Sequence, residues 1–138
     1  MISGVEVVQL DKFCDDRGWL LKVLMRDQIA AEATFGEIYV TVAEPGVIKG
    51  QHYHRECTEW FCVVSGQAKL LLVDLASGER QIITMGEGNM VRVKVPPFVA
   101  HGIQNTGAEL TYLLAYADQP YDYNRPDTIP VSMDFDLS

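Results

Sequence analysis

The sequence predicts an all-β fold, in which a single domain forms a small antiparallel jelly-roll barrel, and three observations support this prediction. The chain has 138 residues, enough for one hydrophobic core but not for two. Short segments rich in β-branched and aromatic residues recur along it, separated by turns that contain glycine or proline. Only residues 26–35 have the composition of a helix.

The N-terminal part is expected to contain two strands before that helix. Residues 5–10 and 19–24 have the composition of strands, and the Cys-Asp-Asp-Arg-Gly sequence of residues 14–18 is typical of a turn between them. Residues 26–35 are rich in alanine, which favours helix, but their apolar face is narrow. We therefore expect a short helix.

From residue 37 onward the pattern is that of strands. We expect them at residues 37–43, 48–54, 59–64, 68–74, 81–84, 90–95, 102–105 and 110–116. Pro120, Pro126 and Pro130 interrupt the segment that follows, and proline lacks the N–H that a central strand must donate. Residues 118–138 are therefore expected to form an irregular tail on the outside of the barrel or against a partner.

Composition excludes several classes of protein. The net charge of -8 argues against binding to nucleic acid, which depends on clustered lysine and arginine. No apolar run approaches the roughly 18 residues that a membrane span requires. The three cysteines are an odd number, and the first residues resemble no secretory signal, so we expect a cytoplasmic protein with reduced thiols.

Two short segments contain the residue types that bind transition metals. His52 and His54 lie two positions apart on an expected strand, so their side chains point to the same face. Glu59 starts the next strand, and His101 follows a turn at residues 96–97. A His-x-His pair alone is more often a surface or core feature, but the added glutamate and third histidine favour a metal site. Imidazole and carboxylate together suit zinc, iron, manganese or nickel better than calcium or magnesium.

Both segments resemble sequence motifs of the cupin superfamily. The first motif is matched by Gly46, His52, His54, Glu59 and Gly66. The second is matched by Pro96, His101 and Asn105. This second match is looser, because Met90 and Phe98 stand where the family often has glycine. The resemblance implies a single cupin domain over residues 1–138, with the histidines and the glutamate inside the barrel.

Longer stretches resemble the dTDP-4-dehydrorhamnose 3,5-epimerases. The likeness is greater still to the C-terminal cupin domain of two-domain capsular-polysaccharide enzymes that act on a UDP-4-hexulose. The shared motifs are K-G-x-H-Y-H at residues 49–54, V-V-S-G at 63–66, I-x-N-T-G at 103–107 and N-x-P-D-T at 124–128. The resemblance spans residues 13–128 and implies a nucleotide sugar as the substrate.

The epimerase likeness also assigns roles to individual residues. It places His52 on the general base, which removes a proton α to a 4-keto group, and Tyr112 on the proton donor. It assigns substrate binding to Arg17, Lys49 and Tyr53. The chain departs from the metal-free epimerases in lacking the aspartate that pairs with their base and the lysine that stabilises their enolate.

His54 and Glu59 stand as in the capsular enzymes' cupin domain, which holds zinc. The resemblance therefore implies a divalent transition metal, zinc ahead of iron, manganese or nickel, on the four side chains named above. A metal-bound His52 cannot accept a proton on the coordinating nitrogen, so the base would then be metal hydroxide, Tyr112 or Tyr53. Without metal, His52 and His54 are the bases, as in the related sugar 3,4-ketoisomerases.

These inferences lead to one main functional hypothesis and two alternatives. The main one is an isomerase that epimerises or isomerises a nucleotide-linked 4-keto-hexose for surface-polysaccharide synthesis. The alternatives are a non-catalytic sugar- or metal-binding cupin and an iron-dependent dioxygenase. The resemblance further implies a homodimer, in which residues 1–24 are exchanged or packed across the interface and Arg17 reaches the neighbour's pocket.

Overall fold

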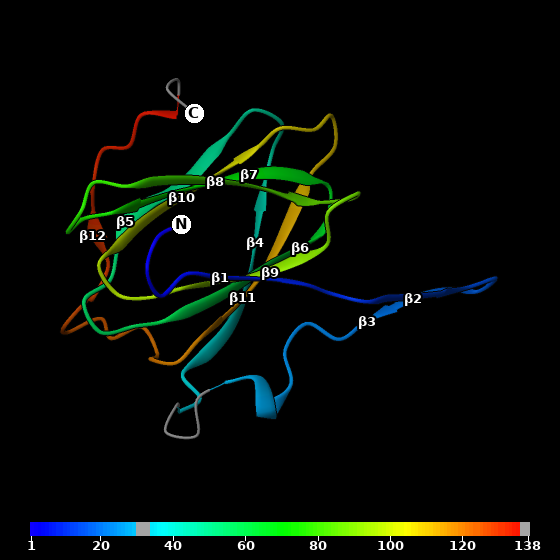
Figure 1. The fold of residues 1–138 in the computed structure, drawn as a ribbon, viewed down its shortest axis with the longest axis horizontal. Coiled ribbons are helices and arrows are strands. Elements are labelled where there is room, and N and C mark those ends of the chain that lie inside the picture. The colour runs from blue at the N-terminus through cyan, green and yellow to red at the C-terminus, as the bar shows by residue number, and fades with distance from the viewer. Residues whose placement is uncertain (30–33, 136–138) are drawn as a thin grey trace.

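The fold, a computed structural model that describes residues 1–29 and 34–135, consists of two five-stranded antiparallel sheets that face each other (Figure 1). The strands are β1 (Glu6–Gln9), β2 (Lys12–Asp15), β3 (Gly18–Leu21), β4 (Glu37–Ala43), β5 (Ile48–Tyr53), β6 (Glu59–Ser65), β7 (Gln67–Asp74), β8 (Arg80–Gly86), β9 (Val91–Val95), β10 (Val99–Asn105), β11 (Thr111–Ala117) and β12 (Ile129–Pro130). One sheet has the order β1-β9-β6-β11-β4 and the other β12-β5-β10-β7-β8. The all-β prediction is confirmed.

The hydrophobic core lies between the two sheets. Alternate residues of each inner strand point inward, as in β6, where Phe61 and Val63 are buried, and in β11, where Leu113 and Ala115 are. Each fully buried side chain of valine or leucine size stabilises the fold by about 1.5–3 kcal/mol through removal of apolar surface from water. The core therefore fixes which residues of the inner strands face the barrel interior.

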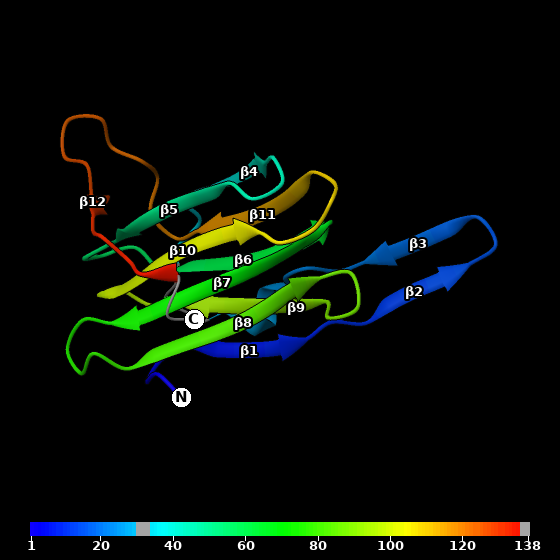
Figure 2. The ribbon, with the colours of Figure 1, turned by 90° about the horizontal axis from the view of Figure 1, so that it is seen from above.

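The hairpin of β2 and β3 stands apart from both sheets. It pairs only with itself, with Lys12 opposite Leu21, and it projects from the barrel in two perpendicular views (Figures 1 and 2). Residues 12–15, whose last two positions were expected in a turn, are paired, and the loop is reduced to Asp16 and Arg17. The strand expected at residues 19–24 ends at Leu21.

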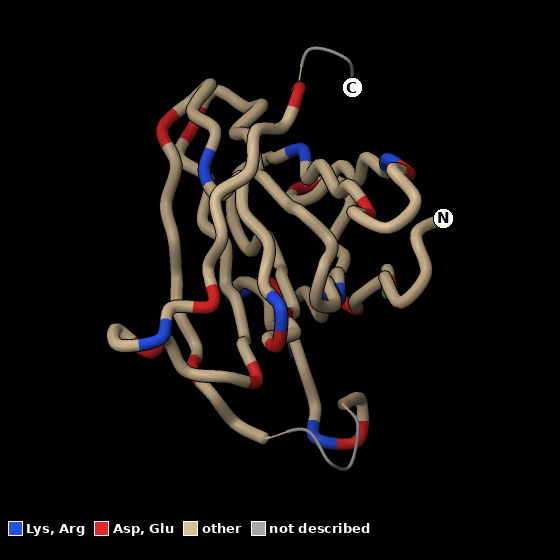
Figure 3. Tube along the Cα trace, turned by 90° about the vertical axis from the view of Figure 1, so that its left-hand side faces the viewer, with Lys and Arg blue, Asp and Glu red and all other residues tan. Residues whose placement is uncertain are grey.

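The helix expected at residues 26–35 is a 3-10 helix, η1 (Arg26–Gln28), and residues 30–33 lie outside the described part of the chain. The described residues contain no helix with the length and hydropathy needed to cross a bilayer. Lysine and arginine residues are scattered rather than gathered on one face in the part of the chain drawn in Figure 3.

The tail returns to the barrel through a short edge strand. β12 pairs with β5, placing Ile129 opposite Tyr53 and Pro130 opposite His52. The N–H of Val131 then donates to the carbonyl of Gln51 at 2.9 Å. Proline is tolerated in β12 because this strand lies at the edge of its sheet, where no further strand needs its N–H. The tail is thereby attached to the strand that carries His52.

Candidate functional site

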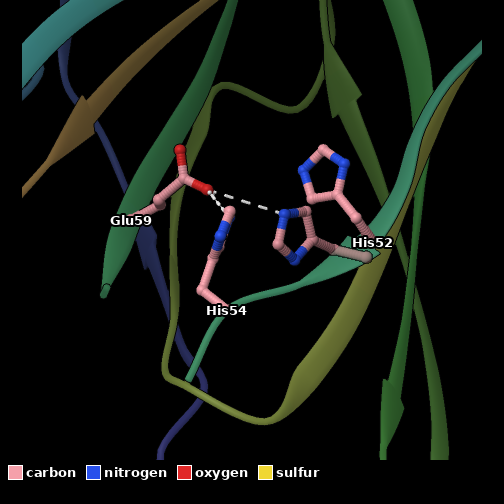
Figure 4. A group of neighbouring side chains, drawn as sticks. His52, His54 and Glu59 are labelled. Carbon is pink, nitrogen blue, oxygen red and sulfur yellow. Dashed lines mark hydrogen bonds and ion pairs between the residues drawn. The ribbon is translucent and has the colours of Figure 1, made fainter. Parts of the chain in front are cut away.

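The three histidines and Glu59 converge inside the barrel from both sheets. His52 lies near the end of β5 and His54 directly after it, His101 lies on β10 of the same sheet, and Glu59 begins β6 of the opposite sheet. β5 and β10 are paired so that His101 stands opposite His52. One ligand atom from each of the four residues lies within 4.8 Å of all the others. Figure 4 shows three of them, His52, His54 and Glu59, pointing into a common space.

Glu59 is the centre of this cluster. Its Oε1 atom lies 2.6 Å from Nε2 of His54 and 3.6 Å from Nε2 of His101. Burial alone would raise the pKa of Glu59, but contacts with His101 and His54 outweigh it and lower the pKa. The carboxylate is therefore ionised and draws positive charge into the cluster.

The outer nitrogens of two histidines are held by backbone carbonyls. Nδ1 of His54 donates to the carbonyl of Asp127 at 2.6 Å, and Nδ1 of His101 donates to the carbonyl of Val99 at 3.1 Å. Since a carbonyl can only accept, the hydrogen must be on Nδ1, and Nε2 of each ring is directed at the cluster. Metal-binding histidines are typically oriented in this way.

Nε2 of His54 faces a carboxylate, so a positive species must lie between the two. In the metal-free chain this is a proton: burial lowers the pKa of His54, but the hydrogen bond and the charge of Glu59 outweigh it and raise the pKa. A divalent cation would satisfy the same pair of atoms. The arrangement thus accommodates either a proton or a metal.

His101 provides a second indication. It is 4 % exposed, and its Nε2 atom has no hydrogen-bond partner among residues 1–29 and 34–135. Leaving a buried polar atom unpaired costs about 1–3 kcal/mol. Coordination of a cation by this lone pair would remove that cost. Three imidazoles and one carboxylate are a suitable donor set for zinc, iron, manganese or nickel, so these residues fit a metal.

Tyr39 is a site residue that the sequence analysis missed. It lies on β4, its hydroxyl donates to Oε2 of Glu59, and burial together with the charge of Glu59 raises its pKa, so it remains a phenol. The available signal was alternation along β4, which places Glu37, Tyr39 and Thr41 on one face.

The cluster lies between two cavities. The larger has a volume of about 480 Å³ and is walled partly by the tail. Its lining includes the charged or aromatic residues Glu37, Tyr39, His52, Glu56, Tyr121 and Arg125. The smaller has a volume of about 180 Å³ and lies within the barrel; its lining includes Tyr39, Lys49, His52, Phe61, Leu70 and Leu113. Tyr39 and His52 border both cavities, so a ligand in either would meet them.

Lys49 reaches the smaller cavity because of a β-bulge. In the pairing of β5 with β10, Gly50 lies opposite Gly102 and His52 opposite His101, which leaves Gln51 as an extra residue with φ of 60°. The bulge allows Lys49 and His52 to face the same interior although they are three positions apart. The Lys49 ammonium donates to the hydroxyl of Thr41 at 2.6 Å.

The structure does not bring the other three expected residues to the cluster of their own chain. Arg17 is exposed in the hairpin loop and pairs with Asp15. Tyr112 alternates with buried Leu113 and therefore lies on the outer face of β11, 39 % exposed. Tyr53 alternates with His52 and borders neither cavity. Its ring packs near that of Phe98, at 6.2 Å between centroids.

Comparison with known proteins assigns the chain to a family. Residues 13–129 match the family described as "Polysaccharide biosynthesis C-terminal domain". The chain belongs to this family. The match includes Arg17, Tyr39, the whole histidine and glutamate cluster and Asp127.

Two curated relatives of this polysaccharide biosynthesis domain match most of the chain. One is the spore coat polysaccharide biosynthesis protein SpsL of Bacillus subtilis, 33% identical over 132 residues, covering 92% of this chain and 87% of the relative. The other is named "Probable low-salt glycan biosynthesis epimerase Agl13", from Haloferax volcanii, and is 30% identical over 132 residues, covering 91% and 85%.

Two solved structures have the same fold. The dTDP sugar isomerase from Desulfovibrio desulfuricans G20 matches with a TM-score of 0.86 and 24% identity, covering 99% of this chain and 88% of that one. The capsular polysaccharide assembling protein CapF from Staphylococcus aureus matches with a TM-score of 0.69 and 25% identity. That match covers 90% of this chain but 34% of CapF, so this chain spans about a third of that protein. The expected resemblance to epimerases, isomerases and capsular enzymes is confirmed.

Proposed function

We propose that this polysaccharide biosynthesis domain is a metal-binding epimerase or isomerase of a nucleotide-linked 4-keto-hexose. The observation that carries the proposal is the convergence of three imidazoles, one carboxylate and the Tyr39 hydroxyl beside a cavity of about 480 Å³. The similarity to a glycan biosynthesis epimerase and to a spore coat polysaccharide protein supports this reaction class and a role in surface-polysaccharide synthesis.

His52, His54, Glu59 and His101 would hold the cation, for which we propose zinc, with iron, manganese and nickel compatible with the same donors. When bound, a divalent cation supplies Lewis acidity that polarises a ketone and stabilises the enolate that forms from it. The lysine that performs this task in related epimerases is missing here, and a cation would replace its positive charge.

Tyr39 is the residue that we assign to proton transfer. A keto group acidifies the neighbouring C–H bond, and epimerisation requires that the proton be removed and then returned. With His52 in the ligand set, Tyr39 is the hydroxyl that lies against the cluster and borders both cavities. Its raised pKa keeps the proton on the phenol, so Tyr39 would return a proton to the enolate carbon after a separate base has removed one.

A metal-free form of the same chemistry is the second candidate, and one observation favours it. Burial and the neighbouring His101 and His54 lower the pKa of His52 to about 4. The imidazole is therefore uncharged above that pH and can accept a proton from the carbon next to the ketone. In this form His52 removes the proton and Tyr39 returns one.

The dimer expected from the sequence is also part of the proposal. The outer face of β4 exposes Ile38 and Val40, which are 59% and 58% exposed, and the hairpin exposes Phe13 and Trp19. Apolar surfaces of this kind typically mark association sites, and a second copy of the chain would cover them. Light scattering at micromolar concentration should give a dimer, and Val40→Asp should shift it toward monomer; a wild-type monomer would contradict the dimer.

Solvent exchange tests the reaction. The purified protein is analysed for metal and then incubated in deuterated water with dTDP- or UDP-linked 4-keto-6-deoxyhexoses, and the sugar is examined by NMR for deuterium at C3 or C5. We expect exchange with at least one sugar. Thermal stabilisation by a sugar without exchange across the panel would instead indicate a binding protein, and oxygen consumption with iron(II) would indicate a dioxygenase.

A further inference from the structure

The tail holds the short segment that joins His54 to Glu59. The Asp127 carboxylate accepts hydrogen bonds from three successive backbone N–H groups, those of Arg55 at 2.8 Å, Glu56 at 2.9 Å and Cys57 at 3.2 Å. Successive N–H groups that point to one place form a concave binding site for an anion. Here that anion is a side chain of the protein itself, 70 to 72 positions later in the sequence.

The same residue also orients His54. The main-chain carbonyl of Asp127 accepts the 2.6 Å hydrogen bond from Nδ1 of that ring. This bond fixes the ring plane and leaves Nε2 directed at Glu59. Asp127 therefore contacts both the ligand at the start of the segment and the backbone that leads to the ligand at its end.

The segment is fastened at its far end as well. The Asp118 carboxylate accepts from the N–H of Thr58 at 2.9 Å, and the N–H of Asp118 donates to the Thr58 carbonyl at 3.1 Å. Residues 55–58 are thus held by two aspartates of the tail rather than by a sheet. Of the two aspartates, Asp127 is the one that also touches a histidine of the cluster.

We propose that Asp127 is a positioning residue, which holds His54 and Glu59 at the separation at which both bind one cation. It acts through the ring of His54 and through the backbone of residues 55–57, without contact with the reacting atoms. This gives a role to the aspartate of the N-x-P-D-T motif at residues 124–128. The part that concerns the cation rests on the proposed function, whereas the part that concerns the segment does not.

The first test uses the metal-free chain. Hydrogen exchange of the amides of residues 55–57 is measured in wild type, Asp127→Asn and the matched control Asp122→Asn. Asp122 lies in the same tail, and within residues 1–29 and 34–135 its carboxylate accepts only from the nearby backbone N–H groups of Asn124 and Arg125. We expect these amides to exchange about tenfold faster or more in Asp127→Asn and unchanged in Asp122→Asn. Equal protection in all three chains would overturn the inference, whether or not the protein binds metal.

The second test measures zinc affinity by competition with a chromogenic chelator. We expect Asp127→Asn to bind zinc roughly 10–100-fold more weakly than wild type, as for other changes that disturb ligand orientation, with Asp122→Asn unchanged. Asp127→Glu retains the charge, and its zinc affinity should lie between those of wild type and Asp127→Asn. This variant also provides the test if Asp127→Asn does not fold. Wild-type affinity in Asp127→Asn and Asp127→Glu would overturn the inference. Absence of zinc binding by wild type would contradict the proposed metal, and the exchange test would then decide the role of Asp127 alone.

Discussion

The histidine cluster and the β2–β3 hairpin both contain residues that were expected to be functional, but they differ in how the fold holds these residues. At the cluster, donors from two sheets meet across a packed core, and the rings of His54 and His101 are held by hydrogen bonds to backbone carbonyls. At the hairpin, Arg17 lies in the loop between two strands that pair with each other, and its backbone N–H and guanidinium donate to the Asp15 carboxylate. The cluster is complete within one chain, whereas the hairpin pairs with neither of the two main sheets.

The largest effect should follow from changing the most buried histidine of the cluster. His101→Leu should weaken zinc binding by more than about 100-fold, because it removes a metal ligand itself. This loss exceeds the one expected from changing a residue that only orients a ligand. The metal-free variant should also melt lower than metal-free wild type, because the change removes the imidazole that lowers the pKa of buried Glu59 and leaves the Val99 carbonyl without its hydrogen bond. Equilibrium dialysis and calorimetry measure the two quantities. Retained zinc binding would show that the cluster is not the metal site.

The next test compares two tyrosines, Tyr39, which faces the cluster, and Tyr112, which faces outward. Tyr39→Phe should slow deuterium exchange into the sugar by about 10²–10⁴-fold, the usual contribution of an acid–base group. Tyr112→Phe, on the outer face of β11, should leave the rate unchanged at low protein concentration. The reverse result would return the donor role to Tyr112 and would require a second chain to bring it to the substrate.

The stability of the metal-free chain should depend on pH through His52. Its pKa is lowered to about 4 in the folded chain, whereas an unfolded histidine titrates near 6.5. As pH falls from about 6.5 to about 4, the unfolded chain therefore binds a proton that the folded chain does not, and stability decreases. Urea unfolding at pH 7 and 4.5 should show a larger loss for wild type than for His52→Asn. Equal losses would show that His52 is charged when folded.

The smallest effect on stability should come from the hairpin. Arg17→Ala should leave the melting temperature unchanged, because exposed ion pairs contribute little. If the hairpin completes a neighbour's cavity, the same variant should raise KM for the nucleotide sugar while zinc binding stays unchanged. An unchanged KM would show that the hairpin takes no part in substrate binding, so that the histidine cluster alone would carry the function.

The features that depend on local sequence could be predicted. The separation of His52 from His54 fixes their common face, and the glycine and proline turns mark most strand positions. Alternation also groups Tyr112 with Leu114 and Tyr116 on one face of β11, but it does not tell which face points outward. The resemblance assigned Tyr112 a catalytic role, whereas the structure places it on the outer face.

The features that depend on pairing between distant strands could not be predicted from the sequence. The register that places His101 opposite His52 arises from the pairing of β5 with β10, which are far apart in the sequence, and the role of Tyr39 appears only when β4 and β6 lie near each other. The role of Asp127 could not be predicted either, because its hydrogen-bond partners lie 70 to 72 positions earlier in the sequence. The bulge at Gln51 breaks the regular alternation that would have placed Lys49 on the other face.

That bulge means that the two halves of β5 follow different phases of inward and outward alternation. A regular pairing with β10 that kept Gln51 in the ladder would turn the half that carries Lys49 outward and withdraw its ammonium from the smaller cavity. The extra residue at Gln51 is therefore what allows one strand to present both Lys49 and His52 to the barrel interior, although an odd number of positions separates them.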